Sequence, residues 1–281
     1  MAIEQILDLE QLEVNIFRGR VHAAAPGLNN RTFGGLVAGQ SLVSAVRTVG
    51  ETFIVHSLHG YFLRPGDPKI PTVFLVERLR DGGSFCTRRV SAVQHGETIF
   101  SMSASFQTDQ EGIHHQDAMP VGPGPEDLEE VRALRLFKDE GFRQFEEWDL
   151  RMVPRDQLEK TPGKASQQRV WFRHRDPLPD DPVLHICALA YMSDLTLLGS
   201  AQVNHPVERD HLMIASLDHA LWFMRPFRAD EWLLYDQTSP SACAGRALTQ
   251  GKIYTQDGEM VAAVMQEGLT RYQRGYQPPA Q

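Results

Sequence analysis

An aspartate interrupts a stretch of sequence that otherwise predicts the apolar face of a helix. Asp194 stands three residues after Tyr191 and three before Leu197, where apolar residues recur at helical spacing. A carboxylate placed against such a face costs free energy unless it is hydrogen-bonded or used as an ion. Held by hydroxyl or amide donors, it could work as a general base. The alternative is that the helix ends early and Asp194 caps a loop or faces solvent.

Polar residues also interrupt two predicted strands. Ser216 lies on an alternating strand and, taken alone, is typical of a packed strand serine. Gln266 interrupts a row of aliphatic residues, and Glu267 interrupts the opposite row in the same way. Periodicity alone leaves open which of these two faces the interior. The strand that carries Ser216 alternates between two sets, namely Ile214, Ser216, Asp218 and Ala220 on one face and Ala215, Leu217, His219 and Leu221 on the other.

These candidates belong to the second half of an internal repeat. Phe62-Leu-Arg-Pro65 ends an alternating apolar stretch in the first half, and Phe223-Met-Arg-Pro226 ends a similar stretch in the second. The offset between Phe62 and Phe223 is matched, to within one position, by the offset between the turn glycines Gly96 and Gly258. Two motifs in register indicate a duplication within the chain.

One helix-like segment precedes the strands of each half. The first spans 33–49 and opens with Gly34 and Gly35. The second follows Asp180-Asp181-Pro182, a helix-start signal, and is expected to span 183–198. Each half is therefore predicted to pack a helix across about four antiparallel strands, an α+β arrangement. We expect an N-terminal repeat over 1–108, a linker with a short helix over 109–166, and a C-terminal repeat carrying the candidate residues over 167–281.

Composition narrows the class of protein. The 281 residues are 42% hydrophobic and 23% charged, which is typical of a soluble globular chain. The net charge of −8 disfavours sequence-independent binding to nucleic acid. No secretory leader is evident, and the apolar runs stop short of the roughly 18 residues that a membrane span needs. We expect a cytoplasmic protein with neither a nucleic-acid nor a membrane partner. Three distant cysteines exclude a Cys-x-x-Cys metal site, and no metal or cofactor is predicted.

Five longer stretches carry a family resemblance. They are Phe33-Gly-Gly-Leu-Val-Ala-Gly-Gln40, His56-Ser-Leu-His-Gly-Tyr-Phe-Leu-Arg-Pro-Gly-Asp67, Tyr191-Met-Ser-Asp194, Ser216-Leu-Asp-His-Ala-Leu-Trp-Phe-Met-Arg-Pro-Phe227 and Val264-Met-Gln-Glu-Gly268. Together they resemble the bacterial acyl-CoA thioesterase II (TesB-type) family over nearly the whole chain. The resemblance implies a double hotdog fold, two tandem helix-plus-sheet repeats. It also implies hydrolysis of acyl-CoA to fatty acid and CoA, and assembly as a homodimer or homotetramer.

The resemblance also implies which residues act. In that family a carboxylate, a hydroxyl and a glutamine hold a water that attacks the thioester carbonyl. Matched residue by residue, these are Asp194, Ser216 and Gln266. Relatives usually carry threonine where this chain has Ser216, and serine keeps the hydroxyl but loses the restraining methyl group. Sliding the first predicted helix onto the second places Gln40 opposite Asp194; because an amide cannot act as a base, one hydrolytic site per chain is expected.

Other residues are candidates for substrate contact. Gly34 and Gly35 could present backbone N–H groups to an oxyanion, or could only allow the helix to pack closely on a strand. His56 and His59 are three apart on a strand and point to opposite faces, a poor arrangement for a shared metal. The remaining candidates for substrate binding are Gln40, His59 and three arginines that could offset the CoA phosphates, Arg64, Arg88 and Arg225.

Two alternatives remain at this point. A hotdog acyl-CoA hydratase would pair its helix carboxylate with a histidine, but His185 lies nine residues before Asp194. An acyl-CoA binding or regulatory protein with little turnover is the second alternative, and serine at 216 in place of threonine keeps it open.

Overall fold

The computed structural model describes residues 2–21, 31–131, 145–205, 207 and 211–276. The strands of the first half are β1 (Leu9–Glu13), β2 (Ile16–Gly19), β3 (Ile54–Phe62), β4 (Val73–Asp81), β5 (Phe85–Gln94) and β6 (Glu97–Gln107). Those of the second half are β7 (Trp148–Met152), β8 (Ser166–His174), β9 (Leu212–Ser216), β10 (Asp218–Phe223), β11 (Leu233–Cys243), β12 (Arg246–Thr255) and β13 (Met260–Tyr272).

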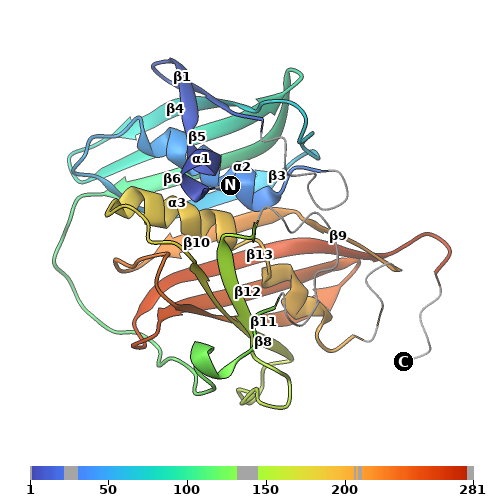
Figure 1. The fold of residues 1–281 in the computed structure, drawn as a ribbon. Helices are drawn as coiled ribbons and strands as arrows, with labels where there is room; N and C mark the ends of the chain where they lie inside the picture. Colours follow the sequence, from blue (N-terminus) through green and yellow to red (C-terminus); the bar gives the residue numbers. More distant parts are fainter. Residues whose placement is uncertain (1, 22–30, 132–144, 206, 208–210, 277–281) are drawn as a thin grey trace.

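These strands form one antiparallel sheet whose order is the same in both halves. From the edge inward the first half runs β1-β2-β4-β5-β6-β3, and the second runs β7-β8-β11-β12-β13-β10 (Figure 1). Strands β3 and β10 pair at the centre, and β9 pairs with β13 outside this order. The predicted α+β double hotdog, with a duplicated helix-plus-sheet unit, is confirmed.

The pairing of β3 with β10 places a pseudo-two-fold axis at the centre of the sheet. His219 pairs with Gly60 and Leu221 pairs with Leu58, on either side of the pair formed by Ala220 and His59. At the offset between Phe62 and Phe223, His219 corresponds to Leu58, and Leu221 corresponds to Gly60. The pair formed by His219 and Gly60 is therefore equivalent to the pair formed by Leu58 and Leu221. The offset read from the motifs is therefore also the structural offset between the central strands.

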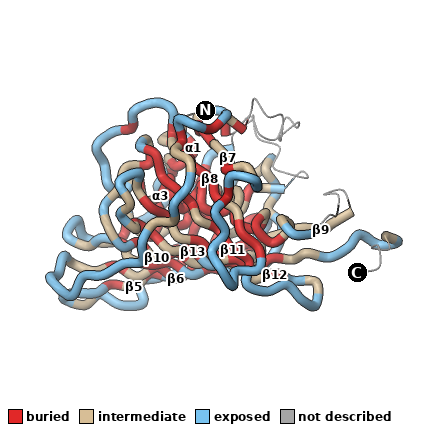
Figure 2. Tube along the Cα trace, turned by 90° about the horizontal axis from the view of Figure 1, so that it is seen from below, coloured by how far each residue is buried: buried red, intermediate tan, exposed pale blue. Residues whose placement is uncertain are grey.

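Three helices lie on one face of the sheet, namely α1 (Ile3–Leu7), α2 (Gly34–Val46) and α3 (Pro182–Met192). Many residues of the helices and of the strands are buried (Figure 2), and they belong to one hydrophobic core. Helices α2 and α3 contact each other closely because α2 presents glycines there. A Cβ on Gly35 would lie 2.0 Å from the Tyr191 carbonyl oxygen, and one on Gly39 would lie 3.3 Å from that of Cys187. The two central helices thus form one layer across the junction of the repeats.

Helix α3 is shorter than predicted. The expected helix over 183–198 ends as an α-helix at Met192, is followed by a turn over 193–196, and continues only as the 3₁₀ helix η4 (Leu197–Gln202). The Ser193 hydroxyl donates to the Ala190 carbonyl at 3.0 Å, and the Leu195 N–H donates to the Met192 carbonyl at 3.0 Å. Such local bonds compete with the regular helix ladder. Asp194 therefore lies just beyond the helix and not on it.

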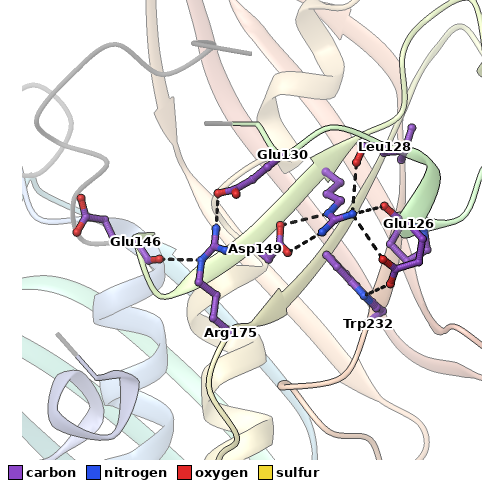
Figure 3. A network of polar contacts seen from close by, with 9 residues as sticks. Glu126, Leu128, Glu130, Glu146, Asp149, Arg175 and Trp232 are labelled. Atoms are coloured by element: carbon purple, nitrogen blue, oxygen red, sulfur yellow. Dashed lines mark hydrogen bonds and ion pairs between the residues drawn. The ribbon is translucent and has the colours of Figure 1, made fainter. Parts of the chain in front are cut away.

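The segment predicted as a linker contributes a strand to the sheet. Its first described helix is the short 3₁₀ helix η2 (Pro125–Asp127), and residues 132–144 of the segment, on which part of the expected helix falls, lie outside the described residues. Strand β7 pairs with β8 at the edge of the second half. Arg151 of β7 donates to the carbonyl oxygens of Pro125 and Leu128, and Arg175 contacts Glu130 (Figure 3). The Arg151 bonds hold the segment together, and the Arg175–Glu130 contact and the β7–β8 pairing attach it to the C-terminal repeat.

The stretch from Pro182 to Gln202 is long and apolar enough to cross a membrane by length and composition. In this structure it supplies core residues, and 61% of its most apolar window is buried inside the molecule. Core helices pass the same test, so the stretch is accounted for by the interior of the fold. Within the described residues, no three His, Cys, Asp or Glu side chains are grouped so as to hold a metal ion.

Truncating a residue beside the pseudo-two-fold axis should destabilise both halves. Leu221 is completely buried and pairs with the equally buried Leu58. We expect Leu221→Ala to lower the free energy of unfolding by about 2–5 kcal/mol, because the cavity cannot close fully. Urea denaturation measures this loss. Leu63→Ala, at a side chain that is 51% exposed, is the matched control and should change it by less than about 0.5 kcal/mol. Equal losses in the two variants would contradict this account of the core.

Candidate active site

The Asp194 carboxylate accepts hydrogen bonds from three separate parts of the chain. Its Oδ1 accepts from the Ser216 hydroxyl at 2.9 Å and from Gln266 Nε2 at 2.5 Å. Its Oδ2 accepts from the backbone N–H of Gly35 at 3.0 Å. Asp194 is only 9% exposed, and these three donors to it are all uncharged. The early end of the helix therefore does not turn the carboxylate toward solvent; it is held inside by neutral donors.

Strand β13 places Gln266 and not Glu267 toward the interior. Gln266 is fully buried in a row with Ala262 and Val264, whereas Glu267 is partly exposed and pairs with Arg246 at 2.9 Å. The Thr249 hydroxyl donates to the Gln266 carbonyl at 2.9 Å, which fixes the backbone at this point. Gln266 Oε1 is buried and has no hydrogen-bond partner among the described residues. The Gln266 amide thus donates from Nε2 to Asp194, and its Oε1 can accept a hydrogen bond from another group in the same site.

The N-terminus of α2 lies directly against the carboxylate. The first N–H groups of a helix lack partners within it and form the positive end of its dipole. A Cβ on Gly34 would lie 2.6 Å from Asp194 Oδ2, and a Cβ on Gly35 would meet the Tyr191 carbonyl. Gly35 is thus needed for the close approach of α2 to α3, and Gly34 for its close approach both to Asp194 and to the Phe62 ring of strand β3. In this structure the Gly35 N–H is already bonded to Asp194, so it is not free to contact an oxyanion.

A break in the strand that carries Ser216 changes which residues share a face. One unbroken strand with alternating faces was expected from Ile214 to Leu221, but β9 ends at Ser216 and β10 begins at Asp218. At the break the Asp218 carboxylate accepts from the Glu267 N–H at 2.7 Å. As a result Ser216 bonds Asp194 while His219 bonds the Ser193 hydroxyl at 2.8 Å, although residues three apart on a regular strand point to opposite faces. The predicted alternation was wrong here, and it had placed His219 on the opposite face.

Sequence reasoning also missed the residues immediately behind Asp194. Besides His219, these are Ser193 and Tyr235, whose hydroxyl donates to the Ser193 carbonyl at 3.0 Å. The two repeats contain a signal for them. At the offset that relates the two halves, His219 corresponds to Leu58 and Tyr235 corresponds to Phe74, so polar atoms stand where the first repeat is apolar.

Burial sets the charge state of the groups around the carboxylate. Burial lowers the pKa of His219, although the neighbouring Asp194 and Asp218 charges oppose that effect. Burial also raises the pKa of Tyr235 well above its usual value, so the phenol keeps its proton. The pKa of the half-buried Asp218 is raised as well, chiefly by desolvation. The lowered pKa leaves the His219 imidazole uncharged at neutral pH, and Asp218 is the second acidic side chain near the site.

The other predicted contact residues lie away from the carboxylate and have partners of their own. The guanidinium of Arg88 is buried at the C-terminal end of α2, where it bonds Thr48. Arg64 is exposed and pairs with Glu97, and Arg225 donates to the Met260 carbonyl. The candidates that the structure does not bring to Asp194, within the part of the chain it describes, are Arg64, Arg88, Arg225, His59 and Gln40.

Gln40 is not equivalent to Asp194. It lies within α2, where its Nε2 donates to the Ile6 carbonyl at 2.7 Å, whereas Asp194 follows the end of α3. Superposing the two helices so that Gln40 matches Asp194 would therefore not match the end of α2 with the end of α3. His59 is exposed on β3 and contacts the edge of Trp222, with ring centroids 4.9 Å apart. Gln40 also forms part of the wall of a pocket with Phe33 and Leu36.

Comparison with known proteins assigns the chain to a family. A family model for acyl-CoA thioesterase matches residues 139–269, and a model for the acyl-CoA thioesterase N-terminal domain matches residues 22–107. Acyl-coenzyme A thioesterase 8 of Mus musculus is 39% identical over 96% of this chain and 89% of its own length. The chain belongs to the TesB-type acyl-CoA thioesterase II family. It is accordingly a thioester hydrolase, as the sequence motifs predicted.

Solved structures agree with this assignment. The acyl-CoA thioesterase II TesB2 from Mycobacterium marinum is 72% identical to this thioesterase, covers 99% of it and 100% of its own chain, and superposes with a TM-score of 0.88. A hot dog fold protein from Alicyclobacillus acidocaldarius is 20% identical and covers 96% of this chain and 98% of its own. It superposes with a TM-score of 0.80 and supports the fold alone.

The close approach of α2 to the carboxylate can be tested with one methyl group. A Cβ at position 34 would lie 2.6 Å from Asp194 Oδ2 and 3.0 Å from the Phe62 ring, so the carboxylate has to move. Because a displacement of about 1 Å can cost about 100-fold in rate, we expect Gly34→Ala to lower kcat/KM for acyl-CoA by about 10- to 100-fold. Thiol release measures this.

Gly50→Ala is the matched control, because its new Cβ would find the nearest heavy atom, on Phe53, only at 3.9 Å. It should leave turnover unchanged. Parental activity in a folded Gly34→Ala protein would show that the helix end need not approach the carboxylate.

Proposed function

We propose that this thioesterase hydrolyses acyl-CoA with a water molecule activated by Asp194 and held by Gln266, while Ser216 orients the carboxylate. The observation that carries the proposal is the set of three neutral donors around one buried carboxylate. A neutral shell leaves Asp194 its negative charge, whereas a paired lysine or arginine would compete with the water proton for it.

The distribution of the donors supports a position for the water. Asp194 Oδ1 already accepts two hydrogen bonds and Oδ2 accepts one, and a carboxylate oxygen accepts about two. Oδ2 therefore has capacity to accept a water proton. Gln266 Oε1, the buried acceptor without a partner among the described residues, can accept the other proton. A water between these two atoms would have its oxygen lone pairs directed away from both.

In the proposed reaction, Asp194 transfers a proton from the water to the leaving group. Asp194 takes one proton from the water as the water oxygen bonds to the thioester carbonyl carbon, which gives a tetrahedral oxyanion. That intermediate collapses, the C–S bond breaks, and the proton passes from Asp194 to the departing CoA sulfur. The products are the fatty acid and free CoA. The Gly34 N–H, in the first turn of α2, is the donor that we propose for the oxyanion, since Gly35 already serves Asp194.

The contacts favour hydrolysis over the alternatives from the same fold. A hydratase would need a histidine that reaches the substrate, but His219 is completely buried and its Nε2 is engaged by Ser193. A protein that only binds acyl-CoA does not need a general base, so binding alone does not account for a buried carboxylate with three donors. Serine at 216 supplies the same hydroxyl hydrogen bond that threonine would supply.

Exchange of the carboxylate for an amide tests the base. Asp194→Asn keeps the shape and removes the charge, so we expect kcat to fall by about 10²–10⁴-fold, the usual contribution of general base catalysis. The measurement is thiol release from a panel of acyl-CoAs of short to long chain, which also gives the chain-length preference. Asp218→Asn is the matched control, because Asp218 is a half-buried acidic residue beside the site.

Each variant has an outcome that decides between the two acids. The asparagine at 218 can still accept from the Glu267 N–H, and turnover should stay within about threefold of the parent. If Asp218→Asn lost activity while Asp194→Asn retained it, Asp218 and not Asp194 would be the base, and the proposed assignment would be wrong. Saturable binding of acyl-CoA by the parent without thiol release would favour the binding-protein alternative.

The hydroxyl and the amide can be tested separately. Ser216→Ala removes one hydrogen bond to a charged acceptor, and we expect kcat to fall by about 10- to 100-fold, while Ser216→Thr keeps the hydroxyl and should retain the parental kcat. Gln266→Leu removes both the donor and the proposed water contact, and should cost more than Ser216→Ala. Glu267→Gln, one residue further on the outer face, is the control. Activity that survives Gln266→Leu would contradict the proposed water position.

The expected homodimer or homotetramer and the cytoplasmic location stay predictions, as do the boundaries at residues 108 and 166. Analytical ultracentrifugation of the purified chain measures the first of these directly.

A further inference from the structure

The residue before Asp194 is held by more hydrogen bonds than the end of a helix requires. The Ser193 N–H donates to the Leu189 carbonyl at 2.9 Å, and its hydroxyl donates to the Ala190 carbonyl at 3.0 Å. Two further bonds come from the sheet, one from His219 of β10 to the hydroxyl and one from Tyr235 of β11 to the carbonyl. Ser193 is completely buried. The turn that carries Asp194 is therefore tied to two strands as well as to its own helix.

The bonds of Ser193 determine which nitrogen of His219 carries the proton. A hydroxyl has one proton, and Ser193 gives it to the Ala190 carbonyl, which can only accept. His219 Nε2 must then donate to the Ser193 oxygen at 2.8 Å. Its Nδ1 is buried without a partner among the described residues. His219 is thus a neutral imidazole that serves as a single donor, which agrees with its complete burial.

Tyr235 is equally constrained. Its ring lies against the backbone of Gly251 in β12, where a Cβ would come within 2.2 Å of the ring. Only a residue without a side chain leaves room for the tyrosine at this point. Its hydroxyl then reaches across to the Ser193 carbonyl at 3.0 Å. The tyrosine and the glycine together bring a fixed donor to the turn.

The first repeat provides an internal comparison. Leu58 stands where the second repeat has His219, and Phe74 stands where it has Tyr235; both are completely buried. The hotdog unit therefore folds with apolar residues at both positions. The polar atoms of the second repeat are additions to that scaffold, and they meet at the residue next to the carboxylate.

We infer that Ser193, His219 and Tyr235 form a positioning clamp that sets where the Asp194 carboxylate lies between Ser216, Gln266 and the start of α2. The inference rests on the proposed function, in which Asp194 is the base. The clamp acts through the backbone of the turn, and its members are buried behind the carboxylate. They are positioning residues, and they exchange no proton with the substrate.

The test uses substitutions that copy the first repeat. Tyr235→Phe and His219→Leu each remove one bond to Ser193 and put in the residue that the first repeat carries. We expect kcat for acyl-CoA to fall by about 10- to 100-fold, because small displacements of a reacting group are costly, while KM changes less than about twofold. His219→Gln, which can present an amide donor in place of Nε2–H, should recover most of the lost kcat. Tyr254→Phe is the matched control, because Tyr254 is a buried tyrosine of β12 that packs with Trp171 and Leu234 in another part of the core.

A double-mutant cycle separates positioning from general loss of structure. In the Asp194→Asn background the clamp has no carboxylate to position, so Tyr235→Phe should change the residual turnover by less than about twofold. An equal loss in both backgrounds would overturn the inference, because it would mean that Tyr235 supports the fold and not Asp194. Circular dichroism melting of each variant identifies any that fail to fold, and the single substitution at His219 provides an independent cycle.

The outcomes also distinguish this inference from the proposed function. Full activity in Asp194→Asn would overturn the mechanism itself. Loss of activity in Asp194→Asn together with parental kcat in both Tyr235→Phe and His219→Leu would overturn the clamp alone. A His219→Gln protein as inactive as His219→Leu would show that the imidazole has a role beyond donating to Ser193.

Discussion

A negative charge buried in a protein interior has to be hydrogen-bonded, and the arrangement of this molecule around Asp194 follows from that constraint. The three donors to the carboxylate come from β9, β13 and the first turn of α2, so both repeats must be in place before the charge is satisfied. The close approach of α2 requires Gly34 and Gly35, where side chains would collide with the carboxylate and with the Tyr191 carbonyl. The same two glycines therefore allow α2 to pack closely and allow its N-terminus to stabilise the Asp194 carboxylate.

The site is asymmetric although the scaffold is symmetric. The sheet order and the central pairing relate the two repeats by a pseudo-two-fold axis, yet the polar groups of the site occur in the second repeat. The first repeat has leucine and phenylalanine where the second has His219 and Tyr235. It contributes its helix terminus instead. One repeat supplies the carboxylate and the other supplies part of its stabilisation.

Much of this could be predicted from the sequence, because it depends on local pattern. The repeated Phe-x-Arg-Pro motif gives the offset that the central strands show, and the apolar spacing around Asp194 indicates that the carboxylate is directed inward. Alternation could not choose between Gln266 and Glu267, since both interrupt aliphatic rows; the family motif chose the residue that the structure buries.

Other features depend on contacts that no local pattern contains. The early end of α3 depends on a serine hydroxyl bonding its own helix, and the break at Leu217 depends on Asp218 accepting an N–H from a distant strand, at Glu267. That break brings His219 to the site, against the expected alternation. Arg88 was a candidate for phosphate contact because of its charge, but its guanidinium is buried against Thr48, a partner far earlier in the chain. The spacing of residues predicts which face of a helix or strand a side chain lies on. It does not predict which group from elsewhere in the chain forms a hydrogen bond with it.

The use of α2 as a donor to Asp194 has a consequence for how the duplication can have diverged. In a symmetric pair of C-terminal repeats, the start of α3 would take the place of the start of α2 beside the carboxylate. That end of α3 carries Asp180, Asp181 and Pro182, which would bring two more negative charges and a residue without an N–H. The second repeat could therefore not supply for itself the helix start that the first repeat supplies. Each site needs one repeat of each kind, so neither half of this chain can build the site alone.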